Sequence, residues 1–480
     1  MEELQRKIET IVARTADNNR WRQQECFNLI PSENTPSLIV KLCEIGDPAG
    51  RYAEHRTLRG SEVYFYQGVD FIRAIEEELR VALRDFFGCA EIEPRPISGQ
   101  MANEIVFKAL VRYRSAGKTG APERLPLVMN NDLTKGGHLS SQPSGALFNY
   151  VTVDPVTGRD VVVNFPIQAD NPYRIDAPAM AELIASRRPG LIIFGKSMFL
   201  YPEPVAAARA AAARLHPAPV IMYDMAHTLG LYGAFQDPFA EGADIVTGST
   251  HKTFFGTQRG VIASNFAEGH PLRKLWTEIR GRAFPGSTSN HHLGTLLGLL
   301  IATYEMNFFR TAYQDQVCRN AKAFARALAD NGLDVEGDQR DGYTETHQVL
   351  VRVRRFGTGE EVARRLEQNN IICNHQALPD DESFIGASGI RTGVQEMTRF
   401  GMTEADFEPL AALVAQAVKG EGNVRGEVIA LRKNFLTMRY CLPPGESCRL
   451  GARLLDSILP SSDYARCFAD NLLSTATTLE

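Results

Sequence analysis

The feature that most constrains the fold is an alternation of short apolar runs with helical stretches in the middle of the chain. Four runs are typical of buried strands: LIIFG (191–195), VIMYD (220–224), DIVTG (244–248) and GVIAS (260–264). Between the first two lies PVAAARAAAARLHPAP, an alanine-rich stretch bounded by prolines and punctuated by arginines, which favours a crossover helix. Strands that alternate with helices predict a largely parallel sheet covered by helices.

The length of the chain predicts more than one domain. Its 480 residues exceed the roughly 250–300 that a single hydrophobic core supports. The spacing of Leu4, Ile8, Ile11 and Val12 predicts an opening amphipathic helix, and another helical pattern runs over 71–88. Beyond residue 293 a long helical region leads into the short strand HQVLVRVR and further amphipathic helices. We therefore expect an N-terminal arm (1–35), a large domain (36–292) and a smaller α+β domain (293–480).

Composition and charge narrow the class of protein. The net charge of -5 argues against nucleic-acid and anionic-membrane partners, because both select for a basic face. The eight cysteines form no CxxC pair, which favours reduced thiols over a disulfide framework or a metal site. The N-terminus lacks the apolar core of a signal peptide, and the most apolar stretch (293–302) is too short to cross a bilayer. We expect a cytoplasmic protein without a metal.

Two strand ends carry residues suited to cofactor chemistry. Lys252, in STHKT, follows the run DIVTG, and Asp224 closes VIMYD with His227 three residues on. Ligands of open α/β folds bind at the carboxyl edge of the sheet, where these side chains would meet. A carboxylate there can keep a pyridine nitrogen protonated, as pyridoxal phosphate requires. Taken singly, the lysine is more often solvated and the aspartate more often caps a helix.

Three further segments indicate a cofactor site only in combination with Lys252 and Asp224. Ser98, Gly99 and Gln100 stand directly before a helix, where free backbone N–H groups can bind a phosphate, although capping is the ordinary role. His138 follows a glycine pair and can lie against an aromatic ring, although a surface loop is the simpler reading. Arg391, in SGIRTG, can grip a carboxylate with two hydrogen bonds, or form a surface ion pair.

In this order the residues resemble the serine hydroxymethyltransferases and their relatives among fold-type I pyridoxal-phosphate enzymes. The resemblance runs from about residue 28 to residue 418 and is carried by NLIPSEN, YAE, SGQMAN, GGHL, DMAH, THKT and SGIRTG. It implies an α/β fold-type I transferase with a mostly parallel, seven-stranded-type sheet in the large domain and a smaller α+β C-terminal domain. It also implies pyridoxal 5'-phosphate as cofactor and a homodimer that shares its active sites.

The resemblance assigns a role to each matched residue. Lys252 resembles the lysine that binds the cofactor covalently, and Asp224 the partner of the pyridine nitrogen. The other positions matched to cofactor contacts are Ser98, Gly99, Gln100, His138, Ser197, His227, Thr250, His251 and Ser289. The substrate-binding positions are Ser32, Tyr52 and Arg391, and those that serve catalysis beside Lys252 are Tyr52, Glu54, Tyr66 and His227. The Tyr52–Tyr66 segment is expected to come from the neighbouring subunit.

The chain also departs from the family pattern. A few extra residues lie between Glu54 and Tyr66, and STSNHH (287–292) stands where the family has a Gln-Gly-Gly-Pro loop. Ser141 replaces a second histidine after GGHL, and Gln376 replaces a folate-contacting asparagine. These changes weaken the case for tetrahydrofolate as a second cofactor. Together with THQV (346–349), the Ser289–His292 arrangement and the C-terminal tail, they are similar to L-threonine transaldolases.

We therefore expect a transferase that makes and breaks the Cα–Cβ bond of β-hydroxy-α-amino acids. The favoured reaction takes the glycine unit of threonine, releases acetaldehyde and adds a different aldehyde. The alternative is a serine or α-methylserine hydroxymethyltransferase that uses tetrahydrofolate, which the retained Glu54 favours. A more remote alternative is a non-catalytic scaffold that binds the cofactor, against which the intact Lys252, Asp224, Arg391 and Glu54 argue.

Overall fold

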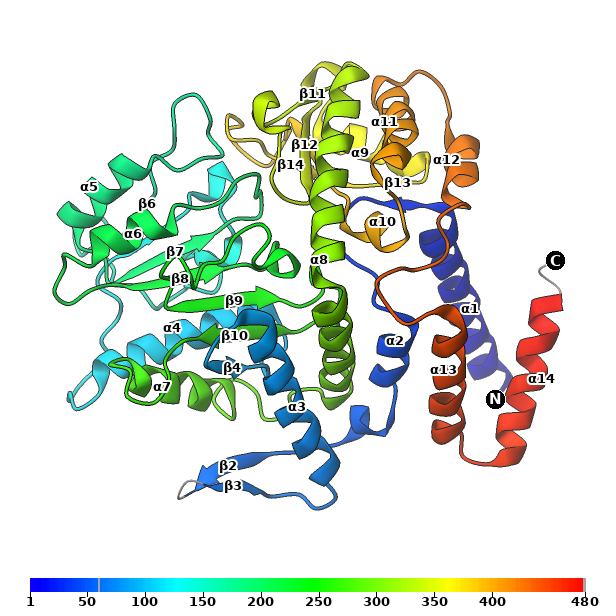
Figure 1. Ribbon diagram of the computed structural model, residues 1–480, viewed down its shortest axis with the longest axis horizontal. Coiled ribbons are helices and arrows are strands. Elements are labelled where there is room, and N and C mark those ends of the chain that lie inside the picture. Colours follow the sequence, from blue (N-terminus) through cyan, green and yellow to red (C-terminus); the bar gives the residue numbers. More distant parts are fainter. Residues whose placement is uncertain (59–60, 478–480) are drawn as a thin grey trace.

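The large sheet of the molecule has seven strands in the order β4-β10-β9-β8-β7-β5-β6, as the computed structural model of residues 1–58 and 61–477 describes it (Figure 1). Neighbours from β9 to β6 are parallel, whereas β10 is antiparallel to both of its neighbours. The mostly parallel sheet is as predicted. The strands are β4 (Glu91–Glu93), β5 (Val128–Asn130), β6 (Val162–Asn164), β7 (Leu191–Gly195), β8 (Val220–Asp224), β9 (Ile245–Ser249) and β10 (Gly260–Ser264).

Helices cover both faces of this sheet. In β7, Leu191 and Ile193 pack in one hydrophobic cluster, while Ile192 and Phe194 pack in the other. Because successive side chains of a strand point to opposite faces, both faces are buried, which explains the continuous apolar runs. One face is covered by α4 (Gly99–Ser115) and α7 (Arg273–Ala283), and the other by α3 (Asp70–Phe87), α5 (Ala177–Arg187) and α6 (Val205–Ala212).

A smaller, antiparallel sheet lies in the second lobe, in the order β11-β12-β15-β14. Its strands are β11 (Asp334–Val335), β12 (Gln348–Arg352), β14 (Asn374–Gln376) and β15 (Gly389–Gly393), and its helices are α9 (Gly359–Gln368), α10 (Gln395–Arg399), α11 (Glu404–Lys419) and α12 (Arg425–Arg432). The long helix α8 (Leu293–Asp330) packs on α3 and on α11, so it joins both lobes (Figure 1). The domain limit at residue 293 stays a prediction.

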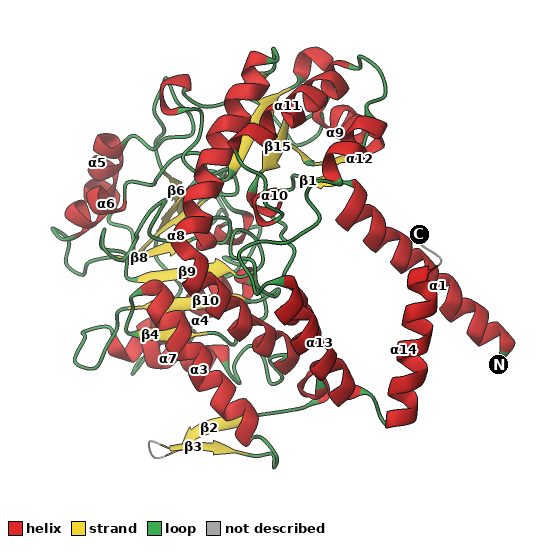
Figure 2. Ribbon diagram, turned by 45° about the vertical axis from the view of Figure 1, so that its right-hand side comes forward, coloured by secondary structure: helices red, strands yellow, loops and turns green. Residues whose placement is uncertain are grey.

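The first 35 residues lie beside the second lobe. The opening segment is helical as expected, as α1 (Glu2–Arg20), followed by a π-helical turn (Trp21–Glu25). Strand β1 (Phe27–Asn28) pairs in parallel with β13 (Ile371–Ile372). Helix α1 buries none of its residues, and its apolar side chains are all more than half exposed. Figure 2 shows α1 pointing away from the body of the molecule.

The C-terminal tail adds two helices to the molecule. The first, α13 (Pro444–Ile458), packs on α2 (Leu38–Glu44). The second, α14 (Ser462–Thr477), extends away from the body, like α1 (Figure 2). No helix among the described residues is both long and apolar enough to span a lipid bilayer.

The extra residues after Glu54 form a β-hairpin. Strands β2 (His55–Leu58) and β3 (Ser61–Tyr64) pair in antiparallel fashion, and the hairpin projects from the lower end of the molecule in Figure 1. The sequence alone did not place this segment.

Candidate active site

Seven of the predicted site residues line one cavity of about 500 Å³ at the carboxyl edge of the large sheet: Ser32, His138, Ser197, His227, His251, Lys252 and Arg391. They meet there because β7, β8 and β9 run in parallel and end at the same edge. Ser197 follows β7, His227 follows β8 and Lys252 follows β9. The rest of the lining includes Leu133, Leu139, Gln376 and Phe384.

Lys252 presents a buried amine to this cavity. Its Nζ atom lies 3.3 Å from Nε2 of His227. Burial lowers the pKa of the Lys252 amine to about 8, against the opposing effect of the Asp224 carboxylate. Burial and the positive charges of Lys252 and Arg391 hold the pKa of His227 well below its usual value. At neutral pH, His227 is therefore an uncharged neighbour of the lysine, able to accept a hydrogen bond at Nε2.

Asp224 is a buried carboxylate held in its ionised form. Burial opposes its charge, but His138, whose Nδ1 atom is 2.6 Å from Oδ2, together with Asn103 keeps the pKa of Asp224 at about 2. Asn103 donates to Oδ2 at 2.8 Å, Ser140 donates to the same oxygen at 3.0 Å, and the backbone N–H of Ala226 donates to Oδ1.

Sequence reasoning missed Asn103 and Ser140. Asn103 stands inside the motif SGQMAN, and Ser140 directly follows the motif GGHL. The available signal was helical spacing, since Asn103 lies four residues after Gly99 and so shares its face of α4.

Arg391 reaches the cavity from the second lobe. It lies in β15, and its side chain donates to the carbonyl oxygen of Ser197 at 2.7 Å and to Oδ1 of Asn374 at 3.2 Å. Burial lowers the pKa of its guanidinium to about 10, so the group stays charged at neutral pH. No carboxylate among the described residues forms an ion pair with Arg391, which leaves its charge for an anionic ligand.

The loop that carries Ser32 is tied to both lobes. Gln395 donates to the carbonyl oxygens of Ile30 and Glu33, and Asn34 donates to the carbonyl oxygen of Lys252 at 2.7 Å. These contacts fix Ser32 at the boundary between the cavity and a larger neighbouring cavity of about 840 Å³. Asn34 is a further site residue that the motif NLIPSEN contained but that sequence reasoning did not single out.

The segment Ser98–Gln100 begins α4 next to the strand that leads to Lys252. The Ser98 hydroxyl caps the helix by accepting from the backbone N–H of Met101. A Cβ atom on Gly99 would lie 2.2 Å from Oγ of Ser249, so only glycine permits this close approach. Gln100 is exposed, and the hydroxyl of Thr250 is occupied by the carbonyl oxygens of Thr257 and Arg259.

Four of the predicted site residues lie away from the cavity of their own chain. Tyr52 and Tyr66 flank the β2–β3 hairpin, are nearly half exposed and stack with their ring centroids 5.6 Å apart. Glu54 immediately precedes β2, and Ser289 is exposed in the loop before α8. None of the four lines the cavity around Lys252.

Comparison with known proteins identifies the family. The family model for serine hydroxymethyltransferase matches residues 5–414. The chain belongs to this family. The serine hydroxymethyltransferase of Pyrobaculum aerophilum is 38% identical over 441 residues, which cover 91% of this chain and 95% of that protein. The serine hydroxymethyltransferase of Archaeoglobus fulgidus is 38% identical over 431 residues, covering 88% and 91%.

A solved structure is also similar over nearly the whole chain. The L-threonine transaldolase from Pseudomonas fluorescens superposes with a TM-score of 0.77 at 25% identity, and the match covers 94% of this chain and 99% of that one. The family and this neighbour confirm the fold-type I α/β fold, an enzyme of the transferase type and pyridoxal phosphate as the cofactor. The non-catalytic scaffold is therefore not favoured.

The residues around the cavity fit this cofactor. The site offers a buried amine, an ionised carboxylate, a histidine ring and a helix N-terminus that approaches closely through Gly99. In addition, Nδ1 of His227 and Nδ1 of His251 are buried and find no hydrogen-bond partner among the residues that the structure describes. Buried polar atoms are rarely left unpaired in a finished structure, so these two atoms are consistent with a site that a polar ligand completes.

Proposed function

We propose that this protein transfers the glycine unit of L-threonine to another aldehyde, as a folate-independent L-threonine transaldolase with Lys252 as the cofactor-binding residue. The observation that carries the proposal is the single cavity in which Lys252, His227 and Arg391 meet. Bound pyridoxal phosphate supplies a ring that accepts electrons from the bond that is cleaved. The side chains of the cavity then decide which bond that is, and where protons go.

In this proposal, Arg391 of the second lobe binds the substrate carboxylate, while residues at the edge of the large sheet hold the cofactor. Arg391, with Ser32 beside it, binds the amino-acid carboxylate through charge-assisted hydrogen bonds. Asp224 keeps a proton on the pyridine nitrogen, because the pKa of its own carboxyl group is lowered to about 2 and the group is therefore ionised at neutral pH. His227 accepts a hydrogen bond at Nε2 beside the reacting amine. Fixing the carboxylate on one side orients the Cα–Cβ bond for cleavage.

The proposed enzyme is a homodimer with shared active sites. Tyr52, Glu54 and Tyr66 sit on or beside the projecting hairpin and not at the cavity of their own chain. Two features support a second subunit: the exposed tyrosine pair, and the exposed apolar face of α1. In the dimer, Glu54 of the neighbouring chain is the group that moves the proton of the β-hydroxyl.

Three observations favour threonine and an acceptor aldehyde over serine and folate. Gln376, which replaces the folate-contacting asparagine of the family pattern, lines the cavity. The cavity is also bordered by Leu133, Leu139 and Phe384, an apolar rim suited to the body of an aromatic or aliphatic aldehyde. The similarity to a transaldolase over 94% of the chain supports the same reaction.

The proposal is tested by incubating the purified protein with L-threonine and a panel of aldehydes in the absence of folate. We expect acetaldehyde to be released only when an acceptor aldehyde is present, together with a new β-hydroxy amino acid. Lys252→Ala is the control, and borohydride should no longer fix the cofactor to that variant. Turnover by the Lys252→Ala variant at the wild-type rate would refute the assignment of this lysine.

A hydroxymethyltransferase acting on serine or α-methylserine is the second candidate. The curated relatives that cover 91% of the chain carry the name serine hydroxymethyltransferase, and Glu54 is retained. The same assay separates the two candidates. Formation of glycine from serine only when tetrahydrofolate is added, with no acetaldehyde from threonine, would establish this second function.

A further inference from the structure

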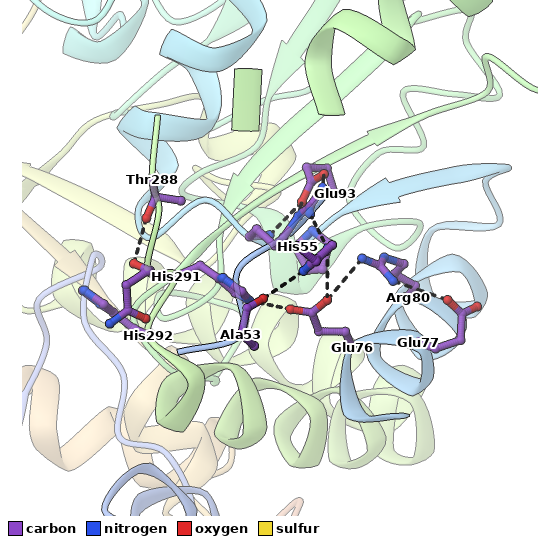
Figure 3. A network of polar contacts seen from close by, with 12 residues as sticks. Ala53, His55, Glu76, Glu77, Arg80, Glu93, Thr288, His291 and His292 are labelled. Carbon is purple, nitrogen blue, oxygen red and sulfur yellow. Dashed lines mark hydrogen bonds and ion pairs between the residues drawn. The ribbon is translucent and has the colours of Figure 1, made fainter. Parts of the chain in front are cut away.

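A buried cluster of polar side chains lies between two of the segments in which the chain departs from its family pattern (Figure 3). One segment begins with His55, at the root of the β2–β3 hairpin, and the other is the loop 287–292, which contains His291. Both histidines are at most 3% exposed. Glu76 on α3 lies between them: it accepts a hydrogen bond from Nε2 of His291, and its Oε2 atom is 4.0 Å from Nε2 of His55.

His55 fixes the backbone on either side of Glu54. Its Nδ1 atom lies 2.9 Å from the carbonyl oxygen of Ala53, and its Nε2 atom lies 3.0 Å from Nη1 of Arg95. Because an arginine can only donate, Nε2 of His55 accepts and Nδ1 carries the proton that goes to Ala53. Glu54 is therefore held in a short bridge whose two ends are anchored by one buried ring.

The anchor is itself rigid. Arg95 is held by Glu93 through hydrogen bonds of 2.7 and 2.5 Å, and both side chains are almost fully buried. The ring of His55 also stacks on Phe284, with centroids 5.1 Å apart. Buried ion pairs with this many contacts confer a defined geometry more than stability.

The other end of the cluster holds the replaced loop. Arg259 donates to the carbonyl oxygens of His291 and His292 at 2.6 and 3.0 Å, while Glu76 binds the His291 ring. Arg80 also donates a hydrogen bond to the Glu76 carboxylate, at 3.4 Å. The loop is thus fastened to the same helix, α3, that supports the root of the hairpin.

We propose that His55 is a positioning residue that sets the placement of Glu54 and Tyr52 for the active site of the neighbouring subunit, through its buried hydrogen bonds to the Ala53 carbonyl and to Arg95, which Glu93 holds in turn. This inference rests on the proposed sharing of active sites. Displacement of a catalytic group by about 1 Å can lower the rate on the order of a hundredfold. Loss of an anchor beside such a group should therefore lower kcat measurably.

The test uses hybrid dimers purified through two different tags. One chain carries Lys252→Ala, and the other carries Tyr52→Ala with Glu54→Gln. Only one of the two sites then combines an intact Lys252 with an intact hairpin segment, and that hairpin segment comes from the Lys252→Ala chain. We expect this parental hybrid to keep about half of the wild-type activity.

His55→Phe is then added to one chain at a time. Phenylalanine keeps the stacking on Phe284 but loses both hydrogen bonds. In the Lys252→Ala chain, it should lower kcat about tenfold or more while the KM for threonine changes little. In the other chain, whose hairpin segment is already inactive, it should leave the activity within about twofold of the parental hybrid.

Two further variants serve as a rescue and as a matched control. His55→Asn keeps a donor in the place of Nδ1 and should recover part of the activity. His270→Phe is the matched control, since His270 also stacks on a phenylalanine, Phe266, with centroids 4.9 Å apart, but lies in the loop before α7. It should leave activity unchanged in either chain.

Equal losses from His55→Phe in both chains would overturn the proposal, because they would mean a general role in stability. Activity equal to that of the parental hybrid with His55→Phe in either chain would overturn it as well. An inactive parental hybrid would refute the sharing of active sites, and this inference with it. The proposed transaldolase activity would be unaffected by that result, because the wild-type enzyme tests it separately.

Discussion

Nδ1 of His138 and Oδ2 of Asp224 lie 2.6 Å apart at the carboxyl edge of the large sheet. The contact links a glycine-rich loop to the end of β8, two segments separated by 86 residues. It places a flat ring and an ionised carboxylate side by side, and Asn103 donates a hydrogen bond to the same carboxylate oxygen at 2.8 Å. In the proposed function, the His138 ring lies against the cofactor ring and the Asp224 carboxylate faces its nitrogen.

Replacing Asp224 by Asn removes the charge and leaves the shape of the site. We expect kcat to fall by about a hundredfold or more, because the ring nitrogen loses the anion that keeps it protonated. The KM for threonine should change little, since we propose that Arg391 binds the substrate carboxylate. Steady-state kinetics with a fully cofactor-loaded enzyme would check this, and a variant with unchanged kcat would contradict the assigned role.

The rate at which the apo-protein takes up pyridoxal phosphate should rise with pH through about 8. Burial lowers the pKa of Lys252 to about 8, and only the neutral amine above that pH can attack the cofactor. The Asp224 carboxylate raises this pKa and Arg391 lowers it. The midpoint should therefore move to lower pH in Asp224→Asn and to higher pH in Arg391→Ala, as followed by visible absorbance. Shifts in the opposite directions would show that other charges dominate.

Arg391→Ala should weaken amino-acid binding while the cofactor is retained. Loss of a buried charged hydrogen-bonding partner costs about 1.5–3 kcal/mol, which corresponds to a rise in KM of about ten- to a hundredfold. Arg352→Ala on the adjacent strand β12 is the control, because its guanidinium pairs with Asp380 and Glu336 outside the cavity. Equal KM values for threonine in the two variants would count against Arg391 as the carboxylate contact.

Phe384→Ala should change the preference among acceptor aldehydes. Phe384 is 55% exposed and lines the cavity, so its removal should cost an aromatic aldehyde about 1 kcal/mol of binding, or about fivefold in KM, and a small aldehyde much less. Ile385, which is 94% exposed and does not line the cavity, gives the matched control Ile385→Ala. An identical effect on all aldehydes would place the acceptor elsewhere.

Local patterns in the sequence were sufficient for much of the fold. The four apolar runs became β7 to β10, and the pattern over 71–88 became α3, which ends at Gly88 in the left-handed conformation. The helix expected between two prolines starts after Pro204 but ends at Ala212, before the second proline. GVIAS is antiparallel to its neighbours, because residues 250–259 are too few for the crossover of about a dozen residues that a parallel pair requires.

The sequence by itself determined which chemical groups end the central strands. Lys252 and Asp224 lie within short motifs, and hydrophobic periodicity places those motifs at strand ends. Arg391 was found by its motif alone, and it lies in the middle of β15. Only the tertiary structure decided which distant side chains meet them: Asn103 on Asp224, the Ser197 carbonyl on Arg391, and Glu76 with His291, which is 215 residues away. The reason is physical. A strand or helix is specified by its own residues, whereas a buried polar group takes its partner from whichever segment the packing brings within hydrogen-bonding distance.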